Sequence, residues 1–330
     1  MSPRTDAPAI HGVLADAFAA FLAYRRELGT CHAHVRVQIG HLARFLAREA
    51  PAARGLDGPL LNRWLATLTA RSAATRGHYF RIARQFCLFQ ARVNPGAYVP
   101  DARGGPRAWQ PFRPYPYSLA EIRALLAAAR DLPGSLRPRT YYTLVLLLYT
   151  TGLRLGEAAR LVLGDLDPPT GVLHIRQGKF GKARLVPLAP GVLTRVTAYL
   201  AQRRAAGAPT TAAAPLLWHP GGAYSIRGLQ SGLTGLLNTV CGKRPGRGGP
   251  RVHDLRHAFA QHRLWQWYQA GADVQAKLPL LATYLGHRSF LSTQVYLTAT
   301  PELLAAASDR FHASFGAVLP AAEVCDARYP

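Results

Sequence analysis

Five short segments of the chain contain the side chains that are best suited to chemistry on a phosphodiester. They are residues 151–157 (TGLRLGE), 178–182 (GKFGK), 253–257 (HDLRH), 285–287 (LGH) and Tyr296. Exchange at a phosphodiester places negative charge on a pentacoordinate phosphorus, and the departing alkoxide is a poor leaving group. Arg154 and Arg256 are the candidates to hold the two non-bridging oxygens, because a planar guanidinium binds such oxygens bidentately.

Tyr296 is the candidate nucleophile. A phenol has a pKa near 10, so a base must take its proton as it attacks. His253 is the candidate for that base, and His287 is the candidate to hydrogen-bond a phosphate oxygen. Either histidine could instead be an ordinary side chain of the core.

Two neighbours of these candidates are interpreted as supports rather than catalysts. Glu157 lies one helical turn after Arg154, at a spacing that lets the two side chains meet. His257 directly follows Arg256 and is expected to brace it.

The departing 5′-oxygen needs a proton. Arginine cannot give one near neutral pH, whereas lysine can if its pKa falls. The chain has only four lysines, and two of them, Lys179 and Lys182, lie in the single segment 178–182. Random placement seldom does this, so the segment is predicted to supply an amine, from one lysine or the other.

No grouping of acids beside these segments predicts a metal site. The nearest acids, Glu157, Asp165, Asp167 and Asp254, do not form a carboxylate cluster for Mg²⁺ in the sequence. Permanently charged arginines would then replace the metal ion, and we expect neither a metal nor another cofactor. The four cysteines are scattered without a CxxC pair, which disfavours a zinc site and a disulfide scaffold.

In this order the segments closely resemble those of the tyrosine recombinase (phage integrase) family. Arg154 and His253 are 99 residues apart, His253 and Arg256 three, and His287 and Tyr296 nine. The resemblance covers the whole chain, and it implies a catalytic set of Arg154, Lys179, His253, Arg256, His287 and Tyr296.

The resemblance also bears on the lysine and on the branch of the family. The family's catalytic lysine comes first in a GKG-like turn, which implies Lys179. This chain reads GKFG there, so Lys182 stays an alternative. The stretch between His257 and Leu285 is longer than the simplest family pattern and resembles Xer-like recombinases carried by mobile elements.

The activity that the resemblance implies is site-specific DNA recombination or integration. A strand would be cleaved through a 3′-phosphotyrosyl intermediate and rejoined without metal or ATP. The expected partners are a double-stranded site with inverted repeats, further copies of the chain up to a tetramer in the synapse, and other recombinases. Two alternatives stay open: a catalytically silent DNA-binding protein and a relaxing enzyme like a type IB topoisomerase.

The composition favours a polyanionic partner such as nucleic acid. Forty Lys and Arg against 17 Asp and Glu give a formal net charge of +23. A GC-rich genome would explain the use of arginine over lysine, but not the shortage of acids. No stretch approaches the roughly 20 apolar residues of a membrane span, and we find no signal peptide. We therefore expect a cytoplasmic protein, associated with the nucleoid and not with a membrane.

The elements that must position the five segments are predicted to form two domains. Residues 94–117 hold six prolines and three glycines, which predicts a linker. It separates a helical DNA-binding domain, 11–93, from a catalytic domain, 118–318, which a tail, 319–330, follows. Helix-period spacing predicts that the first domain contains helices over 10–28, 32–49, 58–69 and 72–92.

The helix over 72–92 is predicted to have an apolar and a basic side. Tyr79, Ile82, Phe86 and Phe89 fall on one side of a helical projection. Apolar residues at 80, 87 and 88 predict burial on a further side. The candidate DNA contacts are the arginines of this helix and the basic residues of a Gly- and Pro-rich loop: Arg76, Arg81, Arg84, Arg92, Lys243, Arg244 and Arg247.

The catalytic domain is predicted to be mostly helical with one small β-hairpin. Ser118 and Glu121 form a capping box that opens a helix to about residue 130. Helices are expected over 139–150 and 155–163, and again from residue 190. Strands are expected over 172–176 and 184–188 around the lysine turn. The fold class is therefore mainly α, with a mixed α+β catalytic domain.

Overall fold

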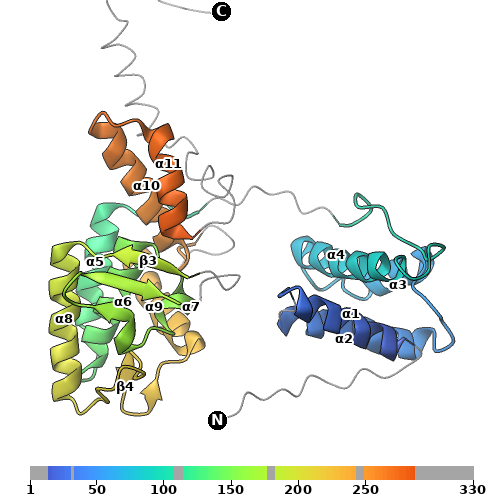
Figure 1. Ribbon diagram of the computed structural model, residues 1–330, viewed down its shortest axis with the longest axis horizontal. Helices are drawn as coiled ribbons and strands as arrows, with labels where there is room; N and C mark the ends of the chain where they lie inside the picture. The colour runs from blue at the N-terminus through green and yellow to red at the C-terminus, as the bar shows by residue number, and fades with distance from the viewer. Residues whose placement is uncertain (1–13, 31–32, 107–113, 177–182, 243–248, 287–330) are drawn as a thin grey trace, which may run out of the picture. The chain divides into compact units, whose positions relative to one another are not determined.

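The computed structural model describes residues 14–30, 33–106, 114–176, 183–242 and 249–286. The chain divides into two compact units, Met1–Phe112 and Arg113–Pro330, each with its own hydrophobic core (Figure 1). The described part is mainly helical with two small sheets, which confirms the predicted fold class. None of the helices in the described ranges is long and apolar enough to cross a membrane.

The first unit contains four helices in its described residues, and each lies within one of the four predicted segments. They are α1 (Ala15–Glu27), α2 (Ala33–Glu49), α3 (Gly58–Ala66) and α4 (Ala73–Gln90). Two of them begin at a side-chain cap: Asp57 accepts a hydrogen bond from the Leu60 N–H at 2.8 Å, and Ser72 accepts one from the Thr75 N–H at 3.3 Å. Polar caps in the sequence thus fixed where these helices begin.

The core of the first unit is aromatic. The ring centroids of Phe18 and Phe86 lie 4.4 Å apart, and Trp64 is fully buried. In α4, Tyr79, Ile82 and Phe86 are buried, as predicted from their spacing. Burial on a further side of α4 is also confirmed at positions 80 and 87, whereas the prediction is wrong for Leu88, which is 40% exposed.

The second unit contains seven helices in its described part, together with a three-stranded and a two-stranded sheet. The helices are α5 (Leu119–Arg130), α6 (Arg137–Thr151), α7 (Leu155–Ala158), α8 (Pro190–Ala205), α9 (Ile226–Cys241), α10 (Asp254–Gln269) and α11 (Val274–Leu285). The strands are β1 (Leu166–Asp167), β2 (Val172–Ile175), β3 (Arg184–Pro187), β4 (Trp218–His219) and β5 (Gly222–Ala223). Both sheets are antiparallel, in the orders β1-β2-β3 and β4-β5.

Three sequence predictions for this unit are confirmed. Ser118 and Glu121 form both hydrogen bonds of a capping box at the start of α5. Helix α6 ends at Gly152, whose φ of 62° places it in the left-handed region that glycine tolerates. The hairpin of β2 and β3 is present, with Leu173 opposite Val186.

The predicted helix over 155–163 is wrong beyond residue 158. The chain leaves the helix there because the backbone of the next residues pairs with a distant segment. The Leu216 N–H donates to the Leu161 carbonyl at 2.8 Å, and the Leu163 N–H donates to the Ala214 carbonyl at 2.9 Å. A pairing over some 50 residues is not visible in local periodicity. Strands β1, β4 and β5 were missed for a different reason, because each is only two residues long and too short to show an alternating pattern.

Helices α10 and α11 form a hairpin with its own small core, distinct from the main core of the unit. Phe259, Leu264, Leu278 and Leu281 make up most of it. The hairpin extends away from the sheets and the other helices (Figure 1). Only the first turn of α10 and the last turn of α11 therefore belong to the candidate site, and both ends lie close to the C-terminal end of α6.

Candidate active site

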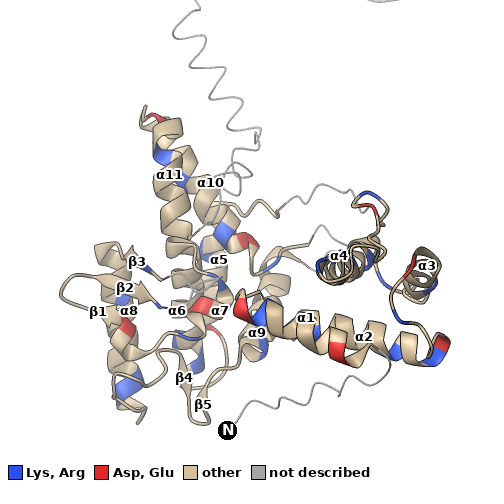
Figure 2. Cartoon of the chain, turned by 45° about the vertical axis from the view of Figure 1, so that its right-hand side comes forward, with Lys and Arg blue, Asp and Glu red and all other residues tan. Residues whose placement is uncertain are grey.

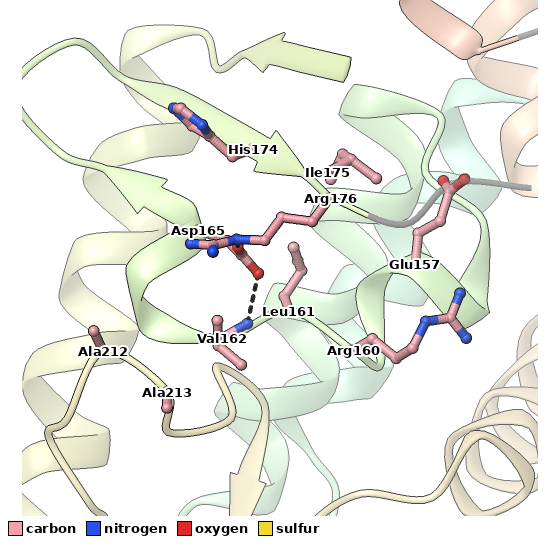
Figure 3. Close-up of a pocket in the computed structure, with 10 residues that line it drawn as sticks. All are labelled: Glu157, Arg160, Leu161, Val162, Asp165, His174, Ile175, Arg176, Ala212 and Ala213. Carbon is pink, nitrogen blue, oxygen red and sulfur yellow. Dashed lines mark hydrogen bonds and ion pairs between the residues drawn. The ribbon is translucent and has the colours of Figure 1, made fainter. Parts of the chain in front are cut away.

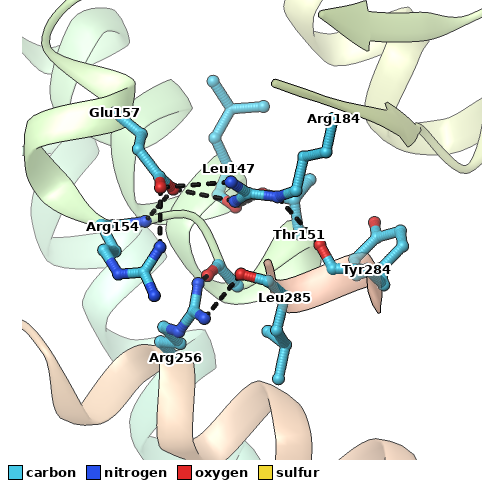
Figure 4. Close-up of polar contacts among 9 residues, drawn as sticks. Leu147, Thr151, Arg154, Glu157, Arg184, Arg256, Tyr284 and Leu285 are labelled. Atoms are coloured by element: carbon cyan, nitrogen blue, oxygen red, sulfur yellow. Dashed lines mark hydrogen bonds and ion pairs between the residues drawn. The ribbon is translucent and has the colours of Figure 1, made fainter. Parts of the chain in front are cut away.

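Arg154 lies at the start of α7, where it makes two contacts with one carboxylate. Its main-chain N–H donates to Glu157 Oε2 at 2.9 Å, and its Nη1 donates to Glu157 Oε1 at 2.8 Å. The side chain of Arg154 is 23% exposed, whereas that of Glu157 is 1% exposed. Glu157 thus holds the main chain and the side chain of Arg154 (Figure 4), and part of the Arg154 side chain stays exposed to solvent.

A second arginine binds the same carboxylate. Arg184, the first residue of β3, donates from Nη2 to Glu157 Oε2 at 2.8 Å and from Nη1 to Oε1 at 3.1 Å. Burial by itself would raise the pKa of Glu157, but the hydrogen bonds and charge of Arg184 and the hydrogen bonds of Arg154 hold this pKa at about 2. Glu157 is therefore a carboxylate at every physiological pH.

Arg256 is held in a different way. It lies in the first turn of α10, is 2% exposed, and donates to two main-chain carbonyls. Its Nη1 lies 2.6 Å from the Gly152 oxygen, and its Nη2 lies 2.7 Å from the Leu285 oxygen. The guanidinium joins the ends of α6 and α11 to the start of α10 (Figure 4).

Gly152 is needed at this junction for two reasons. Its φ is positive, and a Cβ at this position would lie 2.6 Å from Leu285 Cδ2 and 2.8 Å from Phe259 Cδ1. The close approach lets α6 and α11 bring both carbonyls to Arg256. The glycine of the TGLR segment is therefore a packing requirement as well as a helix stop.

His253 precedes α10 and lies within the electric field of both arginines. Burial lowers its pKa, and the charges of Arg256 and, more weakly, Arg154 lower it further, while Asp254 opposes them. A lowered pKa keeps the imidazole neutral, which is the form that accepts a proton. The ring of His257, which is buried, lies edge-on to that of His253 with centroids 5.2 Å apart.

The loop that leads to His253 is anchored by a fully buried acid. Asp254 accepts two hydrogen bonds from Arg251, from Nε and from Nη2, both at 3.1 Å. The Arg251 carbonyl in turn accepts a hydrogen bond from the Tyr117 hydroxyl at 3.2 Å. These contacts fix the start of α10, and with it the positions of His253 and Arg256.

A pocket of about 530 Å³ adjoins Glu157 on the side of the three-stranded sheet (Figure 3). Arg160, His174 and Arg176 line it, and Asp165 pairs with Arg176 at 2.5 Å. The three catalytic candidates within the described residues, Arg154, His253 and Arg256, do not line it. The candidate site is therefore the arginine–histidine cluster rather than this pocket.

The structure brings together three of the six catalytic candidates: Arg154, His253 and Arg256. The other three, and the alternative lysine, lie outside the described residues, as do the basic residues of the 242–250 loop. These are Lys179, Lys182, His287, Tyr296, Lys243, Arg244 and Arg247. The described chain nevertheless reaches two of these segments at the cluster. Arg184 comes two residues after Lys182, and Gly286 directly precedes His287.

Three of the arginines proposed for DNA contact lie in α4 and Arg92 follows it, and the four differ in their surroundings. Arg84 donates to the Pro100 carbonyl at 2.9 Å, and Arg92 donates to the Tyr24 hydroxyl at 2.6 Å. Arg81 bonds within its own helix, to the Gly77 carbonyl, and Arg76 is half-buried. Lys and Arg residues also occur along other helices of the described chain (Figure 2).

Sequence reasoning missed Arg184 and the carbonyl partners of Arg256. Arg184 was assigned only to a strand, since nothing local separates it from the other 35 arginines of the chain. The one available signal is its place two residues after the lysine turn. The carbonyls of Gly152 and Leu285 carry no sequence signal, because every residue has a carbonyl.

Comparison with known families places this geometry in context. Residues 118–302 match the model of the phage integrase family. The protein y4rE of Sinorhizobium fredii, named as an integrase/recombinase, is 37% identical over 89% of this chain and 92% of its own length. The tyrosine recombinase XerD of Corynebacterium glutamicum is 33% identical over 76% of each chain.

Solved structures agree at the level of the fold. The XerH site-specific recombinase bound to a palindromic difH substrate has a TM-score of 0.63 at 19% identity, over 84% of this chain and 79% of its own. The Tn1549 transposon integrase in complex with transposon right end DNA has a TM-score of 0.61 at 18% identity, over 89% and 98%. These likenesses support the two-unit helical architecture.

Proposed function

The chain belongs to the phage integrase family, and from this premise we propose that it breaks and rejoins DNA through a covalent bond between Tyr296 and a 3′-phosphate. It is a tyrosine-type site-specific DNA recombinase, and its partner is double-stranded DNA. Tyr296 attacks phosphorus and releases a 5′-hydroxyl. The 5′-hydroxyl of a partner strand then attacks the phosphotyrosine, so the bond energy is kept without ATP.

Arg154 and Arg256 bind the non-bridging oxygens of the attacked phosphate. Each is fixed by hydrogen bonds from one side, so little reorganisation is needed when negative charge develops. That single observation carries the proposal: two preorganised guanidiniums lie beside a histidine whose pKa both of them lower. Glu157 and His257 serve as their supports.

His253 takes the proton of Tyr296, and its lowered pKa favours the neutral ring that this step requires. His287 hydrogen-bonds a phosphate oxygen, and Lys179 protonates the departing 5′-oxygen, with Lys182 as the alternative. A substrate with a 5′-bridging phosphorothiolate tests the lysine, since its leaving group needs no proton. Lys179→Ala should cleave it nearly as fast as wild type, whereas Arg154→Ala should fail on it.

The domain roles are part of the proposal. The helical domain, 11–93, and the catalytic domain, 118–318, contact the two sides of the recombination site, and the linker, 94–117, joins them. Among the proposed arginines, Arg81 hydrogen-bonds only within α4 in the described chain, to the Gly77 carbonyl and the His78 ring, and Arg76 Nε has no partner there, so these two are the first to test for phosphate contact. Each lost phosphate contact should reduce the salt dependence of binding by about one unit of slope.

Assembly completes the proposal: four protomers join two duplexes, and the segment after Tyr296 links neighbouring protomers. Thr300, Pro301 and Glu302 have the sequence of a helix start, and apolar residues follow to position 315. Truncation after Thr300 should leave single-site binding nearly intact and abolish synapsis and recombination. A truncated protein that recombines two sites at the wild-type rate would remove this part of the proposal.

Covalent capture tests the function as a whole. A site selected from random DNA with Tyr296→Phe is nicked, incubated with the wild-type protein and examined by denaturing gel and mass spectrometry. An adduct on Tyr296 is expected. Absence of any adduct favours the silent DNA-binding alternative, and an adduct that persists in Tyr296→Phe refutes the assignment of the nucleophile. Relaxation of supercoils by a monomer, without two-site recombination, would favour the topoisomerase-like alternative.

A further inference from the structure

Arg184 uses its whole guanidinium for hydrogen bonds at the candidate site. Its side chain is 9% exposed, and three of its nitrogens donate hydrogen bonds. Two of these bonds go to the carboxylate of Glu157, at 2.8 and 3.1 Å, and Nε donates to the Tyr284 carbonyl at 3.0 Å. One guanidinium thus joins β3, α7 and the last turn of α11 (Figure 4).

Each of these three elements leads directly to a proposed catalytic residue. Strand β3 begins two residues after the lysine segment in the sequence. Glu157 also binds Arg154 through its main chain and its side chain. The Tyr284 carbonyl lies next to that of Leu285, which binds Arg256, and three residues before His287 in the sequence.

The space around Arg184 fits a planar guanidinium closely. A Cβ added to Gly286, whose φ is 69°, would lie 3.1 Å from Arg184 Nη1 and 3.2 Å from its Cδ. Lysine has one nitrogen and no fork, so it cannot bond both carboxylate oxygens and a carbonyl from one fixed position. The glycine of the LGH segment therefore makes room for this side chain.

We infer that Arg184 is a positioning residue for strand cleavage, an inference that rests on the proposed function. It touches no reacting atom. Through Glu157 and the Tyr284 carbonyl it fixes Arg154 relative to β3 and to the last turn of α11. A residue that only stabilised the fold would change the melting temperature and leave the cleavage rate of the folded protein unaltered.

The test compares Arg184→Gln and Arg184→Lys with a matched control, Arg176→Gln. Arg176 directly follows β2, whose last residue pairs with Arg184, and it also pairs with a buried carboxylate, that of Asp165, but outside the cluster. The probe is the nicked duplex selected with Tyr296→Phe. For each variant we would measure the melting temperature, the affinity for the intact site and the single-turnover rate of covalent adduct formation.

Arg184→Gln should slow adduct formation by about 100-fold with little change in affinity, because misplacement of about 1 Å at a reacting group costs that much. Arg184→Lys should fall between Arg184→Gln and wild type, and the control should cleave at the wild-type rate. Wild-type cleavage by folded Arg184→Gln would overturn the inference. Failure of the wild-type protein itself to form an adduct would instead count against the proposed function.

A double-variant cycle tests whether Arg184 acts through Glu157. If it does, Arg184→Gln combined with Glu157→Gln should cleave no more slowly than the slower single variant, because both remove the same support. Losses that multiply in the double variant would show independent roles and would overturn this route of action. Melting temperatures of all three variants, measured in parallel, confirm that folded proteins are compared.

Discussion

The two arginines proposed to bind the phosphate are held by opposite means. Arg154 is 23% exposed and rests on a carboxylate that it shares with Arg184. Arg256 is 2% exposed and donates to the carbonyls of Gly152 and Leu285. One anchor is an ionic network on one short helix and one strand, and the other depends on where two helices end.

The difference teaches how positive charge is distributed at the site. Glu157 neutralises part of the charge of its two arginines, whereas carbonyl dipoles leave the charge of Arg256 intact. Arg256 accordingly lowers the pKa of His253 more than Arg154 does. Arg256 is therefore the stronger local source of positive potential, and Arg154 is the one whose placement depends on other charges.

Arg256→Ala should have the largest effect. It removes the phosphate ligand and leaves two buried carbonyls without their donor, at a cost of about 4 kcal/mol in the free energy of unfolding. Adduct formation on the nicked duplex should fall by more than about 1,000-fold. Urea unfolding and single-turnover cleavage measure the two losses. A stable variant with near wild-type cleavage would show that the carbonyl anchor is dispensable.

Glu157→Gln should destabilise the protein by about 3 kcal/mol, because it removes the buried charge between two arginines. The pH dependence of the free energy of unfolding tests this prediction. The pKa of Glu157 is depressed from 4.5 in the unfolded chain to about 2 in the folded protein. Its contribution is thus present above pH 4.5 and lost as the pH falls toward 2. Unfolding free energies of wild type and variant should therefore converge over that range, and parallel curves would contradict the assignment.

Gly152→Ala should destabilise the protein by about 2 kcal/mol, since a Cβ adds strain at a positive φ and overlaps the side chains of Leu285 and Phe259. The overlap moves the carbonyls of Gly152 and Leu285, which hold Arg256 and form the carbonyl anchor. It leaves in place the Glu157 carboxylate that holds Arg154. The rate of adduct formation on the nicked duplex should fall although Arg154, Glu157 and Arg184 are unchanged. Gly207→Ala is a control with a similar φ of 77° and no neighbour within 4 Å. Equal losses of cleavage in both variants would mean that strain alone, and not the anchor, is responsible.

The smallest expected effect is on the titration of His253. Arg256→Gln should raise its pKa toward 6.5 more than Arg154→Gln does, because the Arg256 charge lowers it more strongly. Histidine ring NMR, with His253 identified by its loss in His253→Gln, measures both shifts. A larger shift in Arg154→Gln would reverse the comparison between the two anchors.

Elements whose signals are local were predicted well. Ser118 and Glu121 predicted the start of α5, and α6 ends at Gly152 close to its predicted end. Both signals are local, because capping and left-handed termination involve neighbouring residues only. The end of α7 was not predicted, since it depends on backbone pairing with residues far along the chain. The strands β1, β4 and β5 were not predicted because each spans only two residues. The domain limits and the roles of Lys179, His287 and Tyr296 stay predictions.

The sequence by itself determined which side chains are available for phosphoryl transfer and in what order they occur. It placed Arg154 beside Glu157 and His253 beside Arg256, because three residues separate the members of each pair. Only the tertiary structure decided what holds them. Arg184 meets the Tyr284 carbonyl across 100 residues, and Arg256 meets the Gly152 carbonyl across 104. Such contacts form only when the whole unit has packed, so no local pattern of residue types can specify them.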